Sequence, residues 1–123
     1  MTTPDFDLAG VLPYGVTMEG NGTTKPVPAT KHSKTIGDNL GVPVGPSRVF
    51  ASWSGPQEVN LGVYRPGAGT VIIGTIPAGK GTRSLVVPYG AKADNESAFL
   101  SSNSGPLSAG TRGTLEIYPM PSD

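Results

Sequence analysis

Apolar and polar residues alternate along several short stretches of the chain, and each stretch is closed by glycine or proline. The clearest case is residues 58–65, where valine and leucine alternate with polar or small residues. Successive side chains of a β-strand point to opposite faces, so a period of two predicts a strand with one buried face. Residues 48–53 and 114–118 alternate in the same way, with Trp53 on the apolar side. The pattern predicts β-strands, with Trp53 in the core.

Two further runs are rich in β-branched residues and lack clear alternation. Residues 70–76 and 83–88 are such runs, and short apolar runs of this type are typical of strands with more burial. Residues 94–100 are ambiguous, because Asp94 is a residue type that caps helices whereas residues 98–101 suit a strand. We favour the strand there.

These strands begin near residues 48, 58, 70, 83, 97 and 114 and are separated by glycine- and proline-rich turns. Regular spacing of short strands, without an amphipathic helix, is typical of antiparallel sandwiches and small barrels. We therefore predict an all-β fold, an antiparallel β-sandwich or jelly-roll-like domain, over residues 47–123.

Residues 1–46 have a different composition, with six prolines and seven glycines. Proline lacks the N–H group that a sheet requires and restricts the residue before it, so this segment is predicted to be an extended N-terminal arm. A solvated, disordered tail would have the same composition. The arm is expected to add one or two edge strands, for instance at residues 16–19.

Charge and composition exclude several classes of protein. The 123 residues suffice for one domain, and nine acidic residues balance nine basic ones, whereas nucleic-acid-binding proteins are usually basic. There is no cysteine, so disulfides and thiolate metal sites are excluded. Residues 1–20 lack the pattern of a signal peptide, and no run is long enough for a transmembrane helix. We expect no nucleic-acid partner, no membrane partner and synthesis without a cleaved leader.

One stretch is similar to a phosphate-binding loop. Residues 74–81 nearly fit the pattern Gly-x4-Gly-Lys-Ser/Thr, but Gly81 stands where the motif needs a hydroxyl group. The following residues 83–88 are β-branched and end in proline, whereas a phosphate loop must lead into a helix. We therefore interpret the stretch as a hairpin turn between two strands.

The sequence contains few residues that suit catalysis or metal binding. His32 is the one histidine, and it lies in the arm between lysines, away from any fixed carboxylate. Glu58 and Glu116 lie on the polar faces of predicted strands, where solvated surface acids are common. Asp94 and Glu96 lack the spacing of a calcium loop. We predict no catalytic residue, no metal and no cofactor.

Exposed aromatic and basic residues are the remaining candidates for contacts. Tyrosine is favoured at interfaces, and aromatic rings also cover the apolar face of sugars. The tyrosines concerned could equally be half-buried packing residues. The candidate contact residues are Tyr64, Tyr89, Tyr118, Lys25, Lys31 and Lys34.

The whole chain resembles the small virion proteins of tailed bacteriophages in style. The resemblance rests on the opening residues 1–5, the proline- and glycine-rich arm, turns such as residues 76–79 and 107–110, and the proline-rich end at residues 119–123. The chain is similar to capsid decoration proteins and minor tail proteins. The resemblance includes no diagnostic motif.

This resemblance implies a non-enzymatic structural protein of the virion, made in the host cytoplasm. Its implied partners are other virion proteins, such as major capsid or tail subunits, and further copies of itself in a homo-oligomer. An arm that orders on docking would staple neighbouring subunits. The alternative function is a carbohydrate-binding module for host-surface glycans, which β-sandwiches also support.

Overall fold

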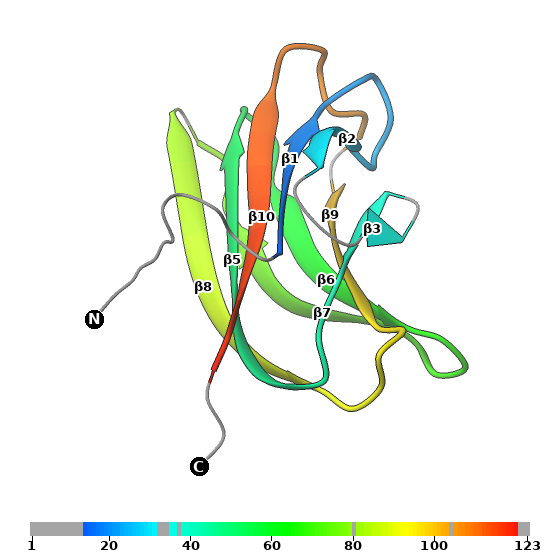
Figure 1. Ribbon diagram of the computed structural model, residues 1–123. Coiled ribbons are helices and arrows are strands. Elements are labelled where there is room, and N and C mark those ends of the chain that lie inside the picture. The colour runs from blue at the N-terminus through cyan, green and yellow to red at the C-terminus, as the bar shows by residue number, and fades with distance from the viewer. Residues whose placement is uncertain (1–13, 32–34, 37, 80, 104, 121–123) are drawn as a thin grey trace.

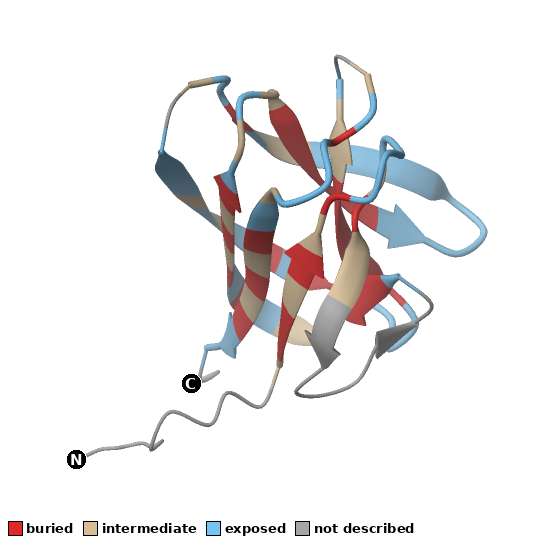
Figure 2. Cartoon of the chain, turned by 90° about the horizontal axis from the view of Figure 1, so that it is seen from above, coloured by how far each residue is buried: buried red, intermediate tan, exposed pale blue. Residues whose placement is uncertain are grey.

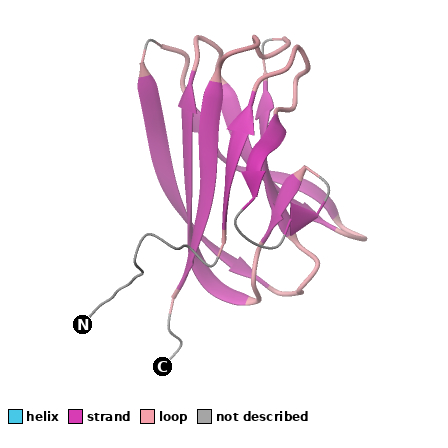
Figure 3. Cartoon of the chain, turned by 45° about the horizontal axis from the view of Figure 1, so that its top comes forward, coloured by secondary structure: helices cyan, strands magenta, loops and turns pink. Residues whose placement is uncertain are grey.

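Ten β-strands and no helix make up the described part of the chain in the computed structural model (Figure 3). The structure describes residues 14–31, 35–36, 38–79, 81–103 and 105–120. The strands are β1 (Gly15–Glu19), β2 (Val27–Lys31), β3 (Thr35–Ile36), β4 (Asn39–Gly41), β5 (Gly45–Ser54), β6 (Val59–Arg65), β7 (Gly69–Ile76), β8 (Thr82–Ala91), β9 (Ser97–Ser102) and β10 (Arg112–Pro119). The six strands predicted from the sequence are confirmed as β5 to β10.

The strands form two five-stranded antiparallel sheets packed face to face (Figure 1). Sheet A has the order β2-β1-β10-β5-β8, and sheet B has the order β3-β4-β9-β6-β7. From β4 to β6 and from β7 to β10 the chain changes sheet at every connection. The predicted all-β, jelly-roll-like sandwich is therefore confirmed.

The core lies between the two sheets and follows the alternation seen in the sequence. Trp53 is 1% exposed, and buried and accessible residues alternate along β5 and β10 (Figure 2). The largest fully buried side chains are Trp53, Met18, Leu40, Leu61, Ile76, Leu100, Leu107, Leu115 and Ile117. Burial of these apolar side chains is the main force that holds the sheets together.

The described part of residues 1–46 belongs to the sandwich, which corrects the prediction of a separate arm. β1 lies inside sheet A, between β2 and β10, and is not an edge strand. Pro28 is tolerated because β2 is an edge strand and its pairing with β1 shifts register at that point. Residues 1–13 lie outside the described residues.

The runs at residues 70–76 and 83–88 are less buried than predicted. β7 and β8 are the edge strands of their sheets, so each has a neighbour on one side alone. Val71, Ile72 and Val86 are 38%, 49% and 57% exposed. A β-branched run gives no information about strand order, which is set by pairing with distant segments.

Candidate functional site

The three candidate tyrosines occupy different environments. Tyr64 lies on β6 in sheet B and Tyr118 on β10 in sheet A, and they are 43% and 42% exposed. Because they belong to opposite sheets and both point outward, they do not form one site. Tyr89 on β8 is 8% exposed, so its ring packs inside the protein and is not available for contacts at the surface.

The candidate lysines do not gather into a described basic cluster. Lys25 is half-buried, and its ammonium group lies 5.1 Å from the centroid of the Phe99 ring, a cation–π distance. Lys31 ends β2, where its backbone pairs with Val16. The side chain of Lys31, and Lys34 and His32 as a whole, lie outside the described residues.

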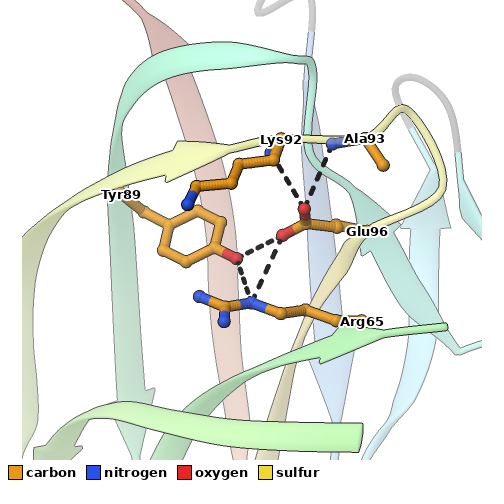
Figure 4. Close-up of polar contacts among 5 residues, drawn as sticks. All are labelled: Arg65, Tyr89, Lys92, Ala93 and Glu96. Carbon is orange, nitrogen blue, oxygen red and sulfur yellow. Dashed lines mark hydrogen bonds and ion pairs between the residues drawn. The ribbon is translucent and has the colours of Figure 1, made fainter. Parts of the chain in front are cut away.

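Tyr89 belongs to a polar cluster at one end of the sandwich (Figure 4). Its hydroxyl group donates a hydrogen bond to Oε1 of Glu96, and Arg65 Nε donates to the Tyr89 hydroxyl oxygen at 2.9 Å. Arg65 Nε also lies 3.6 Å from Glu96 Oε1. Glu96 Oε2 accepts the backbone N–H groups of Lys92 at 2.9 Å and Ala93 at 3.2 Å.

The electrostatics of this cluster fix its protonation state. Burial of Glu96 works against its charge, but hydrogen bonds from Tyr89 and two backbone amides, with Arg65 nearby, outweigh it and lower the pKa of Glu96. Burial, with the hydrogen bond to Glu96, raises the pKa of Tyr89. Glu96 is 4% exposed and both its oxygens are engaged. The cluster therefore ties β8 of sheet A to β6 of sheet B, and the Glu96 carboxylate is not available to a substrate.

The outer face of sheet A carries an exposed apolar and aromatic surface. Strand register places three residues side by side in one row and three in the next. Val86 is 57% exposed and Tyr118 42%. We call this surface the sheet A patch; it consists of Glu116, Phe50 and Val86 in the first row and Tyr118, Arg48 and Pro88 in the second.

Within the sheet A patch, Tyr118 is fixed by its neighbour on the same strand. Its hydroxyl group donates to Glu116 Oε1 at 2.5 Å. Partial burial and this carboxylate raise the pKa of Tyr118 to about 12. The hydroxyl group of Tyr118 is thus engaged while 42% of the residue stays exposed, which suits the ring for contact with another molecule.

The other half of this face is hydroxyl-rich. Register aligns Thr17, Thr114, Ser52 and Ser84 across four strands, and the hydroxyl oxygens of Ser52 and Thr114 lie 2.9 Å apart. An open depression of about 550 Å³ covers this region. The ion pair of Arg112 Nη2 with Glu19 Oε2, at 3.1 Å, lies beside it.

The outer face of sheet B carries the exposed ring of Tyr64 and, nearby, the Phe99 ring, which is 9% exposed. Gly62 on β6 lies between Ile72 on β7 and Phe99 on β9. A Cβ atom on Gly62 would lie 2.4 Å from Phe99 Cζ, so the Phe99 ring lies directly over this glycine. Tyr64 follows on the same strand face, and Ile72 is 49% exposed.

A polar network continues this face along β6. Asn60 Nδ2 donates to Asn103 Oδ1 at 2.6 Å, and Asn103 Nδ2 donates to Glu58 Oε2 at 2.9 Å and to Asn60 Oδ1 at 3.2 Å. Thr75 Oγ1 donates to Asn60 Oδ1 at 3.0 Å. Two amides, a carboxylate and a hydroxyl group are therefore held in fixed orientations.

The other candidate residues and motifs from the sequence do not form a catalytic or metal site where the structure describes them. Glu58 belongs to the sheet B network and Glu116 to the sheet A patch, so they form no carboxylate pair. Residues 74–81 include a turn between strands, but β7 and β8 lie in different sheets, so it is not a hairpin turn. Among the described residues, no three acidic or histidine side chains gather as metal ligands. The described part of the chain also holds no helix long and apolar enough to cross a membrane.

Sequence reasoning missed most of both surfaces. Alternation placed Arg48 and Phe50 on one face of their strand, but residues 83–88 lack clear alternation and gave no face for Val86. No local pattern showed which strands are neighbours. The contact between Asn60 and Asn103 joins residues 43 apart and has no signal in a local pattern.

The fold places this chain in the structural class of jelly-roll β-sandwiches. No protein-family model matches the chain, and no curated protein matches it. Among solved structures it is similar to the globular domain of the zebrafish complement 1qA protein, with 14% identity over 89% of this chain and 98% of that chain, at a TM-score of 0.56. It is also similar to murine APRIL in a crystal structure at pH 8.0, with 10% identity, 84% and 98% coverage and a TM-score of 0.52. At these identities the likeness shows the fold alone.

Proposed function

We propose that this chain is a non-enzymatic structural protein that assembles with further copies of itself through the sheet A patch. The observation that carries the proposal is the exposure of Val86 and Tyr118 beside Phe50 and Arg48 on one sheet face. Tyrosine, phenylalanine and arginine are enriched at protein interfaces, and tyrosine and arginine are frequent among the residues that contribute most binding energy. An exposed apolar residue on an edge strand such as β8 also favours association.

Charge supports a second copy as the partner. The sheet A patch contains Arg48 and Glu116, one of each sign, in adjacent rows. A surface with both charges is complementary to itself, because each arginine can face the glutamate of a neighbouring copy. A net charge of zero also removes the general repulsion between closely spaced copies.

The biological setting that we propose is the virion of a tailed bacteriophage, as a decoration or minor tail protein. Support for this part comes from the resemblance of the sequence in composition and turn style. It predicts that the chain is found by peptide mass spectrometry in purified particles of the phage that encodes it. Its absence from such particles would remove the virion assignment and leave the self-assembly proposal standing.

Self-assembly is tested by light scattering on the purified full chain. We expect a defined multiple of the chain mass of 12.5 kDa, and we expect Val86→Glu to shift it to the monomer, because a charge is then buried in the interface. Thr24→Glu is the matched control, since Thr24 is exposed in the β1–β2 loop, far from β8 (Figure 1). Tryptophan fluorescence of Trp53 shows whether each variant is folded.

Two results would contradict the proposal. One is a wild-type chain that stays monomeric over the accessible concentration range. The other is an oligomer that Val86→Glu leaves intact while Trp53 stays buried, which would place the interface elsewhere.

A further inference from the structure

We propose that the outer face of sheet B binds a short chain of pyranose sugars along β6, between Tyr64 and the network around Asn60 and Asn103. The two surfaces lie on opposite sheets, so this proposal goes beyond the assembly function and does not depend on it. The sugar class is one with equatorial hydroxyl groups, because its rings have extended apolar faces.

The first element of the site is an apolar wall at Tyr64. Tyr64 is 43% exposed and Ile72 49%, and strand register makes them diagonal neighbours across β6 and β7. Gly62, which lies opposite Ile72 in the same row, adds no side chain above the sheet, and the Phe99 ring lies over it. An exposed ring and an aliphatic side chain over a flat floor can cover the C–H face of a sugar.

The second element is the polar network on the same face. Sugar hydroxyl groups both donate and accept hydrogen bonds, and amide and carboxylate groups together supply both functions. Asn103 and Thr75 are exposed, and Glu58 Oε1 has no hydrogen-bond partner among the described residues. Because the side chains already hold one another in place, little ordering entropy is lost when a ligand binds.

The spacing of the two elements sets the size of the ligand. Tyr64 and Asn60 are four residues apart on one strand, which corresponds to about 13 Å. A di- or trisaccharide spans such a distance with one ring over Tyr64 and another beside Asn103. A single sugar would reach one element alone.

The chemistry of this face favours a sugar over a second protein copy. The sheet A patch groups Phe50, Val86, Pro88 and Tyr118 in two adjacent rows, which gives it a continuous apolar and aromatic surface. On the sheet B face two exposed apolar side chains adjoin a carboxylate, two amides and the exposed hydroxyl groups of Thr70 and Thr75. The amides, the carboxylate and the hydroxyl groups supply the directed hydrogen bonds that a sugar needs, and the exposed ring supplies its apolar contact.

The test is a titration of the isotope-labelled full chain with cellotriose and, separately, chitotriose, followed by backbone amide NMR shifts. We expect at least one of them to shift the signals of Tyr64, Thr75 and Asn103. Tyr64→Ala should weaken binding by about tenfold, corresponding to one aromatic contact. Tyr64→Phe should bind within about twofold of the wild type, because the ring is retained.

Tyr118→Ala is the matched control, since Tyr118 is exposed to the same degree on the other sheet and its loss should leave binding unchanged. The proposal is overturned if neither trisaccharide shifts these signals. It is also overturned if Tyr118→Ala weakens binding as much as Tyr64→Ala, or if Tyr64→Ala changes the mass in solution. Val86→Glu should still bind the sugar, which separates this site from the assembly interface.

Discussion

Replacing Glu96 by glutamine keeps the shape of the side chain and removes its negative charge. In the structure this carboxylate accepts three hydrogen bonds, from the Tyr89 hydroxyl group and from the backbone N–H groups of Lys92 and Ala93. A glutamine can offer one oxygen, and its NH2 group must face either the two backbone donors or the tyrosine. At least one donor in a buried site then loses its acceptor or is forced to turn away.

The expected cost follows from the difference between charged and neutral hydrogen bonds. A bond to a charged group contributes about 1.5–3 kcal/mol and a neutral one about 0.5–1.5 kcal/mol. Over three bonds, with partial compensation by rotation of the Tyr89 hydroxyl group, Glu96→Gln should lower the free energy of unfolding by about 2–3 kcal/mol. That is a large part of the stability of a small domain, which is about 5–15 kcal/mol.

The assay is urea unfolding followed by the fluorescence of Trp53, the one tryptophan, at a fixed chain concentration. A double-mutant cycle with Tyr89→Phe and Glu96→Gln should give a coupling of about 1–2 kcal/mol. The control cycle uses Tyr118→Phe and Glu116→Gln, which carry the same chemical pair on the outer face of sheet A. There the coupling should not exceed about 0.5 kcal/mol, because water competes for both groups.

Equal couplings in the two cycles would refute this reasoning. So would a fully stable Glu96→Gln variant, since the buried cluster would then contribute no more than an exposed pair. Either result would mean that the two sheets are held at this end by apolar packing alone.

Three further predictions concern Glu96, Gly62 and Tyr118. The pKa of Glu96 is lowered in the folded state from 4.5, so its contribution to stability is complete above that pH and is lost as the pH falls below it. The free energy of unfolding, measured from pH 6 to pH 3, should therefore fall more steeply for the wild type than for Glu96→Gln. Parallel curves would contradict this. Gly62→Ala should destabilise the chain by about 1–3 kcal/mol, because its Cβ would lie 2.4 Å from Phe99, whereas Gly90→Ala, with open space around it, should change thermal stability little. Titration of phenolate absorbance should show a step near pH 12 that is absent in Tyr118→Phe.

The strands of the second half of the chain could be predicted from the sequence because each follows a local rule. Alternation along residues 58–65 gave the buried face of β6, and the same rule placed Tyr64 and Tyr118 outward. It also placed Trp53 in the core. These properties depend on the period of a strand and on nothing further along the chain.

The remaining features depend on pairing between distant segments, which a local pattern does not contain. β7 and β8 have the composition of buried strands, but the sheet order makes them edges. The prolines of residues 1–46 predicted an unpaired arm, yet β1 finds partners on both sides. The surroundings of Tyr89 likewise depend on Arg65 and Glu96, which reach it from another strand and a turn.

The pairing of β1 with β10 determines when the protein can finish folding. The first described strand and the last one are neighbours in sheet A, with Val16 opposite Leu115, and β10 also bridges β1 to β5. While the ribosome is still making residues 112–119, neither β1 nor β5 has its central partner and the core lacks Leu115 and Ile117. Closing such a long loop is slow compared with forming a hairpin. Sheet A is therefore completed only once residues 112–119 have been made, and until β10 pairs a growing chain exposes unpaired strands that neighbouring copies can reach.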